Sequence, residues 1–441
     1  MEKTLTTSSF VRKNKFTEMR DFLVLWIGQL ISTIGSAMTA FGLGVYVYQR
    51  TNSATDFALI FLVGMLPRAI FSPIAGVLAD RFDRRRLMVI SDVGALVGIG
   101  FVLAMAATAR LEVWHVYLAT FVGSAFSALR IPTYTTVAGM LVTKEQYGRV
   151  GGMIQLGEAV GQVVGPAVAG ALISLLDITS VLTIDIATFV VSLATLFMVA
   201  FPTAKTKTED HGSFVEDIRS GWTYLVSRPG LIGLMTVFVI GNFFIGNAQA
   251  LLTPMILGFA SPQALGAIMS AGGVGMLLGG IALSIWGGGR KRTYTILGFY
   301  VLLGFGVLMA GIVPSETLVG MAVFLAYLSL PFIIGTTNAI LISKVARDVQ
   351  GRVFSLRIML VTISFTVAFV AAGPLADNIF EPLLLPGGAL VPVIGGLFGV
   401  GEGRGIGFMF ALLGIMAMLT AVGGFLAPRL RNVEDELPDA E

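Results

Sequence analysis

Long apolar runs dominate this sequence and leave few folds open to it. A membrane-spanning helix needs about 20 mostly apolar residues. Twelve such runs are predicted at 22–48, 56–79, 87–109, 113–136, 147–175, 178–201, 231–257, 263–286, 294–313, 317–343, 353–376 and 405–427. With 55% hydrophobic and only 12% charged residues, the chain has too little polar surface for water. The sequence therefore predicts an all-α membrane protein of twelve transmembrane helices, with the lipid bilayer as a partner.

Positive charge is distributed unevenly among the segments that connect these runs. If the N-terminus is cytoplasmic, the inside segments contain 24 Lys and Arg residues and the outside segments contain three. Cytoplasmic loops of membrane proteins carry such an excess, so both termini are expected in the cytoplasm. No apolar core of a cleavable signal peptide precedes Phe22. The expected location is the bacterial cytoplasmic (inner) membrane, crossed many times.

Several classes of function are disfavoured by composition. The net charge of +3 includes no basic run, which argues against a nucleic-acid partner. The absence of cysteine excludes disulfides and thiolate metal sites. The only histidines, His115 and His211, lie near membrane edges, and no HExxH or phosphate-binding loop is present. We therefore expect no enzyme activity, no cofactor and no metal, and we expect a monomer.

The twelve runs form two blocks of six with internal similarity. The predicted domains are 1–201, a cytoplasmic linker at 202–229, and 230–441, which ends in an acidic tail. Matching motifs of two to four residues occur at equivalent runs of each block: 148–150 and 351–353, 165–166 and 373–374, and 63–66 and 274–277. Parallel six-helix repeats of this kind are typical of transporters. The fold prediction is two pseudo-symmetric six-helix bundles.

Two segments outside the runs also have distinctive patterns. Phe214, Ile218, Trp222 and Leu225 recur at helical spacing in the linker. This favours an amphipathic helix at the membrane surface, or equally a partly solvated linker helix. The segment 377–404 is an apolar outside loop, and its composition fits either a loop that dips into the membrane interface or one that caps the outer mouth.

The turn between the second and third runs places two acids among four arginines. It resembles the loop signature of the major facilitator superfamily, which Gly76, Asp80, Arg81, Arg84 and Arg85 match, whereas Asp83 stands where the signature has glycine. The resemblance implies that Asp80 ties the two bundles together near the start of the eleventh span. A carboxylate is favoured at a helix N-terminus by the helix dipole and the free amides. A positive-inside anchor is the alternative interpretation.

The fifth run contains a spaced set of small residues. Gly152, Gly161, Gly165, Pro166 and Gly170 resemble the antiporter signature of the same superfamily, with Ala169 in place of one glycine. In that superfamily the motif accompanies proton-coupled efflux. The other interpretation of this motif is structural, because small residues four positions apart let another helix pack closely against this one.

Four further segments resemble the macrolide-efflux and enterobactin-exporter branch of drug:proton antiporters. They are 217–230, the two Gly-Arg-Val openings of the fifth and eleventh runs, and 403–405 at the start of the twelfth. The resemblance implies export of an amphipathic molecule.

Ionisable residues inside a membrane are costly and are therefore functional candidates. Glu158 is predicted near the midplane and Asp185 lies in the sixth run, so both are candidates to carry protons. Arg68 and Arg130 also fall within runs. A static ion pair between Glu158 and either arginine is the alternative.

Polar side chains in several runs are predicted to line a shared cavity, because they would otherwise be unsatisfied in lipid. These candidates are Gln29, Ser32, Ser36, Gln155, Gln162, Asn242, Gln249 and Asn338. The polar side chains of each run could instead form hydrogen bonds to neighbouring helices. The leading hypothesis is a secondary active exporter of a small amphipathic molecule, a drug, macrolide or siderophore-like compound, that exchanges it for protons. The alternatives are a lipid or lysolipid translocase, an importer, or a membrane receptor without transport activity.

Overall fold

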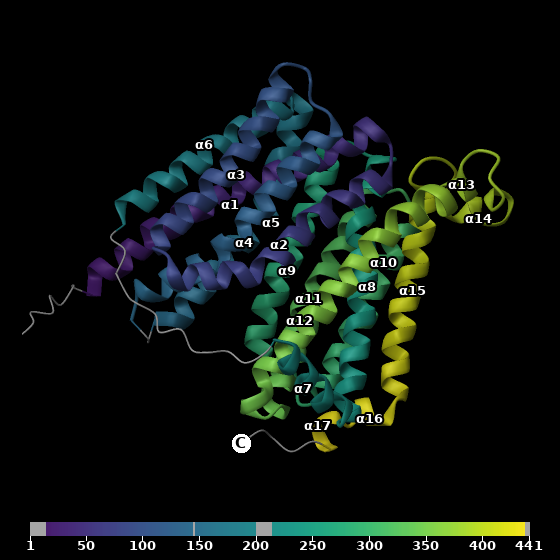
Figure 1. Ribbon diagram of the computed structural model, residues 1–441. Helices are drawn as coiled ribbons and strands as arrows, with labels where there is room; N and C mark the ends of the chain where they lie inside the picture. Colours follow the sequence, from purple (N-terminus) through teal and green to yellow (C-terminus); the bar gives the residue numbers. More distant parts are fainter. Residues whose placement is uncertain (1–14, 144–145, 200–213, 437–441) are drawn as a thin grey trace, which may run out of the picture.

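The computed structural model describes residues 15–143, 146–199 and 214–436, which are almost entirely helical (Figure 1). Twelve long helices of at least 21 residues fall in these ranges: α1 Lys15–Thr51, α2 Ala54–Arg81, α3 Arg84–Ala107, α4 Val113–Met140, α5 Tyr147–Leu175, α6 Ile178–Met198, α8 Pro229–Leu257, α9 Pro262–Trp286, α10 Arg292–Ile312, α11 Glu316–Lys344, α12 Arg347–Leu375 and α15 Arg404–Leu426. Each predicted run corresponds to one of them. The prediction of a twelve-helix membrane protein is confirmed.

Judged by length and composition alone, eleven of these helices are long and apolar enough to cross a membrane. The exception is α4, which is 28 residues long. Its second half is less apolar because it contains Arg130 and the run Thr133 to Thr136. A polar helix can span a membrane when its polar side is covered by other helices, and α4 packs against both α2 and α3.

The long helices form two groups, coloured purple to teal and teal to yellow in Figure 1. We call α1–α6 the N-terminal half and α8–α15 the C-terminal half. One core of buried apolar side chains runs through α8 to α12 and α15 of the C-terminal half and continues into α1, α2, α5 and α6 of the N-terminal half. The N-terminal half has two further clusters of its own, one around Phe22 and Met88 and one around Val47 and Val102. Polar side chains occupy the space between those two clusters, as described below.

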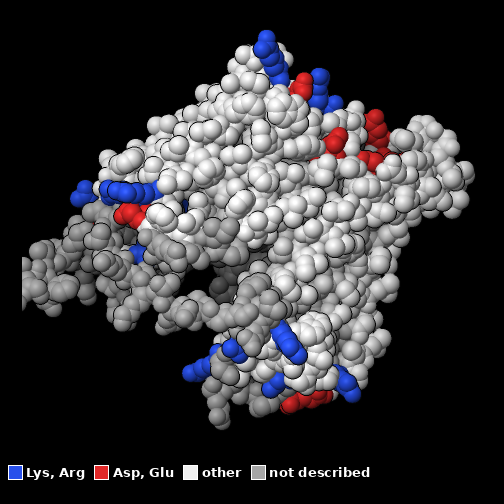
Figure 2. Space-filling model, in the orientation of Figure 1, with Lys and Arg blue, Asp and Glu red and all other residues white. Residues whose placement is uncertain are grey.

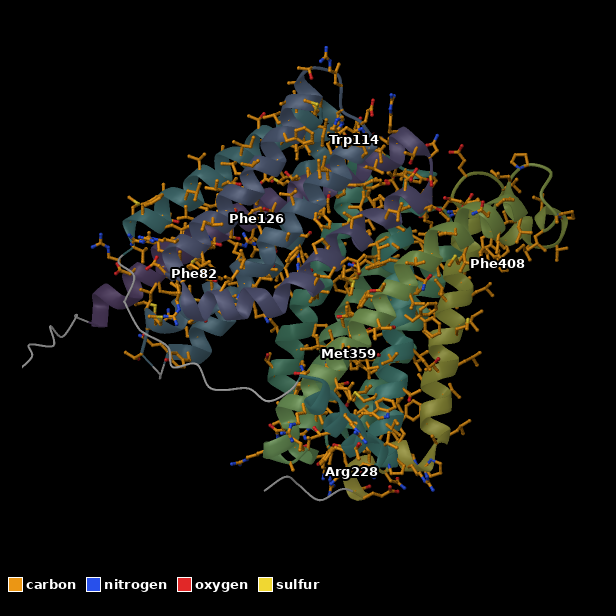
Figure 3. All side chains as sticks on the ribbon, viewed as in Figure 1. Phe82, Trp114, Phe126, Arg228, Met359 and Phe408 are labelled. Atoms are coloured by element: carbon orange, nitrogen blue, oxygen red, sulfur yellow. The ribbon has the colours of Figure 1, made fainter. Side chains whose placement is uncertain are left out.

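The halves meet through two helix pairs, α5 with α9 and α2 with α12. We call the end of the molecule where α2 begins and α12 finishes the closed end, and the opposite end the open end. From their contact near the closed end, the halves diverge toward the open end (Figure 1). Phe82, just after α2, and Arg228, just before α8, lie well apart there (Figure 3).

The predicted linker helix is present as α7, Phe214–Val226, which is amphipathic in sequence. Its Leu225 is buried, and its Tyr224 hydroxyl accepts a hydrogen bond of 3.1 Å from the backbone N–H of Ala346, just before α12. The helix therefore docks on the open end of the C-terminal half. Whether it contacts the membrane surface stays a prediction, and residues 200–213 of the linker, like the side chains of Phe214 and Ile218, lie outside the described residues.

The segment after α12 folds into η2 Ala376–Phe380, α13 Glu381–Leu384 and α14 Val391–Phe398 at the closed end, beside Phe408 of α15 (Figure 3). Glu381 accepts hydrogen bonds from the backbone N–H groups of Gly403 (3.1 Å) and Ile406 (2.8 Å). These groups lie in the first turn of α15, so the carboxylate caps that helix. This loop is anchored on the C-terminal half. Short helices α16 Pro428–Arg431 and α17 Val433–Glu436 follow α15 at the open end.

Candidate functional site

A cavity of about 790 Å³ lies on the face of the C-terminal half that looks toward the N-terminal half. This volume is in the range of sites for drug-sized ligands. Its wall comes from α8, α9, α10, α11, α12 and α15, with Gln162 of α5 as the contribution of the N-terminal half. Most lining side chains are apolar or aromatic, and the polar ones include four predicted candidates: Gln162, Asn242, Gln249 and Asn338.

The other four cavity candidates do not belong to the lining of this cavity. Gln29 and Ser32 are buried inside the N-terminal half, with exposed fractions of 5% and 0%. The Gln29 amide donates a hydrogen bond of 2.8 Å to the Ser192 hydroxyl of α6. Ser36 is half-buried, and Gln155 is exposed on the same face of α5 as Gln162.

Arg357 of α12 is a cavity residue that the sequence analysis missed, since it was counted with the positive segment that follows the tenth span. Its guanidinium lies 4.4 Å from the centre of the Phe238 ring and donates a hydrogen bond to the side-chain oxygen of Asn338. Its Nε atom is buried, with no hydrogen-bond partner among the described residues. The sequence did contain a signal for this residue. Arg357 lies well inside α12, which begins at Arg347, and an arginine at such a position in a membrane helix is a functional candidate.

The charged candidates of the N-terminal half lie near one another on α2, α4 and α5. Arg68 is close enough to Arg130 and Glu158 to interact with both charges. Glu158 is exposed and shares the face of α5 that carries Gln155 and Gln162. Between the described residues, no ion pair within 4 Å joins Glu158 to either arginine. The three groups thus form a loose charged set rather than a fixed salt bridge.

A second group of charges is fully buried between the two apolar clusters of the N-terminal half. Asp185 of α6, a predicted candidate, and Asp92 of α3, which the sequence analysis missed, are each 0% exposed. Asp92 accepts a hydrogen bond of 3.3 Å from Ser192, which itself accepts one from Gln29. Each carboxyl has one oxygen without a hydrogen-bond partner among the described residues. Arg130 interacts with both charges.

The glycines of the antiporter-like motif have three different environments along α5. A Cβ atom on Gly161 would lie 2.8 Å from Thr33, and one on Gly165 would lie 2.5 Å from Ala37, so both glycines let α1 approach within the N-terminal half. A Cβ on Gly170 would lie 2.7 Å from the carbonyl oxygen of Pro262 in α9, across the halves. A Cβ on Gly152 would meet nothing within 4 Å. Pro166 belongs to the crossing contact as well, as its carbonyl oxygen faces Gly266 of α9.

The gating-motif region is described in part. The side chains of Gly76, Asp80 and Arg81, in the last turns of α2, lie outside the described residues. Asp83, the departure from the family signature, is the N-cap of α3 and accepts a 3.0 Å hydrogen bond from the N–H of Arg86.

The two remaining arginines of the motif contact neighbouring helices of the same half. Arg84 donates to the sulfur of Met140 at 2.9 Å, and Arg85 donates to the carbonyl of Val199. These contacts tie the start of α3 to the ends of α4 and α6.

An acid that the sequence analysis did not single out joins the halves at the closed end. Asp377 of η2 accepts hydrogen bonds from the N–H groups of Ala54 (2.9 Å) and Thr55 (2.9 Å) and from the hydroxyls of Ser53 (2.8 Å) and Thr55 (2.7 Å). These groups form the first turn of α2, so a carboxylate of the C-terminal half caps a helix of the N-terminal half. One turn earlier, a Cβ on Gly373 would lie 2.3 Å from the Cα of Thr55, which shows how closely α12 and α2 approach.

Two helical halves around a central cavity, joined by helix pairs at one end, define a multi-pass membrane transporter. The model of the Major Facilitator Superfamily matches residues 25–369, and the chain belongs to this family. It is 28% identical over 364 residues to macrolide efflux protein A of Streptococcus pyogenes, covering 81% of this chain and 90% of the relative. It is 22% identical over 375 residues to the multidrug efflux pump Tap of Mycolicibacterium fortuitum, covering 82% and 90%.

Solved structures agree on the fold at low sequence identity. The nucleoside transporter NupG superposes with a TM-score of 0.67 at 12% identity, covering 93% of this chain and all of that one. A bacterial homologue of the iron transporter ferroportin in an inward-facing state superposes with a TM-score of 0.65 at 13% identity, covering 92% and 98%. Family and fold together confirm the predicted recognition and the transporter class, which is not an enzyme class.

Proposed function

We propose that this protein exports small amphipathic molecules from the bacterial cytoplasm across the inner membrane, in exchange for protons, by alternating access. The observation that carries the proposal is the cavity, which is large, mainly apolar and aromatic, and lies between halves that are joined at one end only. Apolar and aromatic walls bind amphipathic molecules of varied shape. The similarity to macrolide and multidrug efflux proteins supports export as the direction.

The orientation follows from charge. The open end carries the connecting segments that contain most of the Lys and Arg residues, and such segments stay in the cytoplasm. On the face in Figure 2, Lys and Arg side chains cluster at the ends of the two halves that diverge. We therefore assign the open end to the cytoplasm, together with both termini, so that the structure corresponds to an inward-facing state.

Proton coupling requires a group that binds and releases a proton during the cycle. We assign this role to Glu158, and its exposure on the face of α5 that carries the cavity residue Gln162 supports the assignment. Asp92 and Asp185 are further candidates, since each is fully buried and has one oxygen for which the described part of the chain offers no hydrogen-bond donor. A buried carboxylate without donors is stabilised when it takes up a proton.

The test is a comparison of two transport modes in proteoliposomes, with erythromycin as the probe. Glu158→Gln retains size and hydrogen bonding but does not titrate, so we expect exchange of erythromycin to survive and accumulation driven by a pH gradient to be lost. Glu316→Gln is the matched control, because Glu316 is exposed at the start of α11, away from the cavity. It should leave both modes unchanged.

Three outcomes would contradict parts of this proposal. Unchanged proton-driven accumulation in Glu158→Gln would remove Glu158 from the coupling mechanism and direct the same test to Asp92→Asn and Asp185→Asn. A joint loss of both modes and of thermal stability would identify Glu158 as a structural partner of Arg68 or Arg130. Absence of any probe flux in the wild-type protein, with binding retained, would favour a receptor or a lipid translocase over a drug exporter.

A further inference from the structure

The lining of the central cavity has one charged side chain, Arg357, and contains no Asp or Glu among its described residues. An arginine inside a membrane protein is costly, and the usual compensation is a neighbouring carboxylate. No ion pair within 4 Å joins Arg357 to another described residue. It is held instead by the Phe238 ring and the Asn338 side-chain oxygen, which are weaker compensations for a full charge.

Hydrogen-bond donors without partners point at the same region. Arg357 has five N–H donors, and its buried Nε has no acceptor among the described residues. Tyr300 of α10 is also a residue of the cavity lining, its side chain is only 2% exposed, and its buried hydroxyl has no hydrogen-bond partner among the described residues. The two groups are close enough to interact electrostatically. A guanidinium whose Nε–H has no acceptor in the described part of the chain, beside a phenol O–H that also has none, is suited to bind an anionic oxygen.

Charges outside the cavity lining favour an anion too. In the N-terminal half, Arg68 interacts electrostatically with Arg130 and with Glu158, and the three side chains together carry one net positive charge. A cationic amphipath would gain no carboxylate from the described lining of the cavity, so we expect it to bind more weakly than an anion of the same skeleton while still using the apolar wall. The apolar remainder of a ligand would contact the aromatic part of the wall, which includes Phe238, Tyr327 and Phe365.

We propose that the substrate is an amphipathic anion, an apolar and partly aromatic molecule with one acidic group such as a carboxylate, sulfonate or phosphate, and that Arg357 and Tyr300 bind this group. The inference rests on the proposed export function and specifies its substrate class. Arg357 is then the residue that selects for charge, and the aromatic wall accepts variation in the rest of the molecule.

The binding test uses two probes that differ in the acidic group alone. 1-Anilinonaphthalene-8-sulfonate is an anion, and N-phenyl-1-naphthylamine is the same skeleton without the sulfonate. Fluorescence titration of the full chain in lipid nanodiscs, corrected with empty nanodiscs, gives the dissociation constant of each. We expect the wild-type protein to bind the sulfonate more tightly, and Arg357→Gln to weaken sulfonate binding about tenfold or more, with binding of the neutral probe changed less than about twofold.

Control variants separate charge recognition from folding. Arg347→Gln makes the same change at an exposed position of the same helix, outside the cavity lining, and should bind both probes as the wild type does. Arg357→Lys should recover part of the sulfonate affinity, because it restores charge but not the guanidinium geometry. Retained binding of the neutral probe shows that a variant is folded. Equal sulfonate affinity in Arg357→Gln and wild type, or a wild-type preference for the neutral probe, would overturn the inference.

Failure of this inference can be told from failure of the proposed function. If the protein exports erythromycin, which carries a basic amine, but sulfonate binding does not depend on Arg357, the exporter proposal stands and the anion specificity is wrong. If sulfonate binding depends on Arg357 but neither erythromycin nor the sulfonate is transported by the wild-type protein in proteoliposomes, the binding site stands and the exporter function is wrong.

Discussion

The two ends of the interface between the halves are built differently. At the closed end, backbone meets backbone: Gly170 of α5 lies against Pro262 of α9, and Gly373 of α12 lies against Thr55 of α2. Asp377 adds four hydrogen bonds across the halves. Toward the open end the halves diverge (Figure 1). The cavity is lined by the C-terminal half, with Gln162 of α5 as the contribution of the N-terminal half.

This difference shows what must break when the transporter changes state. The glycine contacts contribute by letting the backbones approach closely, and the rings of Phe61 in α2 and Phe369 in α12, 5.2 Å apart, add a side-chain contact across the halves. A charged cap on a helix N-terminus contributes about 0.5–2 kcal/mol. A closure made of such contacts is stable enough to hold one state and weak enough for a substrate or proton to reverse it, since differential binding of about 1–3 kcal/mol shifts such equilibria.

The largest effect is expected from filling the glycine contact between α5 and α9. Gly170→Leu places a side chain where a Cβ already lies 2.7 Å from a backbone oxygen. Overpacking of this kind costs about 1–3 kcal/mol, which changes the ratio of the two states about 5- to 150-fold. We expect the closed end to open and transport to be lost.

The measurement uses labelling from outside with a membrane-impermeant maleimide. The chain has no cysteine, so a single Ala58→Cys in α2, buried near the closed end, reports opening without further changes. Gly170→Leu should increase its labelling rate. Gly152→Leu, in the same helix and motif but with free space around it, is the control and should label like the Ala58→Cys variant alone. Equal rates in the two variants would mean that the close approach of α5 and α9 does not hold this end shut.

An intermediate effect is expected from the cap formed by Asp377. Asp377→Asn removes the charge and leaves one oxygen to accept hydrogen bonds from the start of α2. The loss is about 1–2 kcal/mol, or about 5- to 30-fold in the ratio of states. Labelling of Ala58→Cys should again increase, with part of the transport retained.

Glu381→Gln provides the matched comparison for this cap. Glu381 also caps a helix N-terminus, that of α15, but both partners belong to the C-terminal half. We therefore expect Glu381→Gln to lower the thermal unfolding temperature without changing the labelling rate. If both variants act on stability alone, the cap of Asp377 is structural and has no part in gating.

The sequence predicted the elements of this fold well and the contacts across it poorly. Every predicted span is a helix, because runs of about 20 apolar residues have one stable arrangement in lipid. The glycine motif was recognised, but spacing alone does not show that Gly161 and Gly165 face α1 while Gly170 faces α9. Asp377 was assigned to a loop, since nothing local relates it to Ala54, a partner 323 residues away.

The candidate site was only partly predicted, again because local sequence does not show which distant residues meet. Gln162, Asn242, Gln249 and Asn338 were found because a polar residue in an apolar run demands a partner or a cavity. The same rule did not separate cavity walls from helix interfaces, so Gln29 and similar residues were grouped with them. Arg357 was missed because positive charge near a span boundary fits a cytoplasmic loop, and the boundary of α12 was placed several residues too late.

The smallest effect is expected at the open end, where the family resemblance assigns a gating role to Asp80. Asp80 and Asp377 belong to the same helix pair at opposite ends: Asp377 follows α12 and caps α2, whereas Asp80 lies at the end of α2, toward the start of α12. The residue before α12 is Ala346, which has no side chain that could cap this helix. We therefore expect Asp80 to supply that cap when the open end closes.

Asp80→Asn should then act in the direction opposite to Asp377→Asn. It removes about 0.3–1 kcal/mol from the outward-facing state, or about two- to fivefold in the ratio of states, so labelling of Ala58→Cys should slow. Asp83→Asn, three residues away, is the control because Asp83 caps α3 within one half. Distant caps should act independently, so the double variant Asp80→Asn with Asp377→Asn should label between the two single variants. A double variant that labels faster than Asp377→Asn alone would contradict the opposed roles of the two acids.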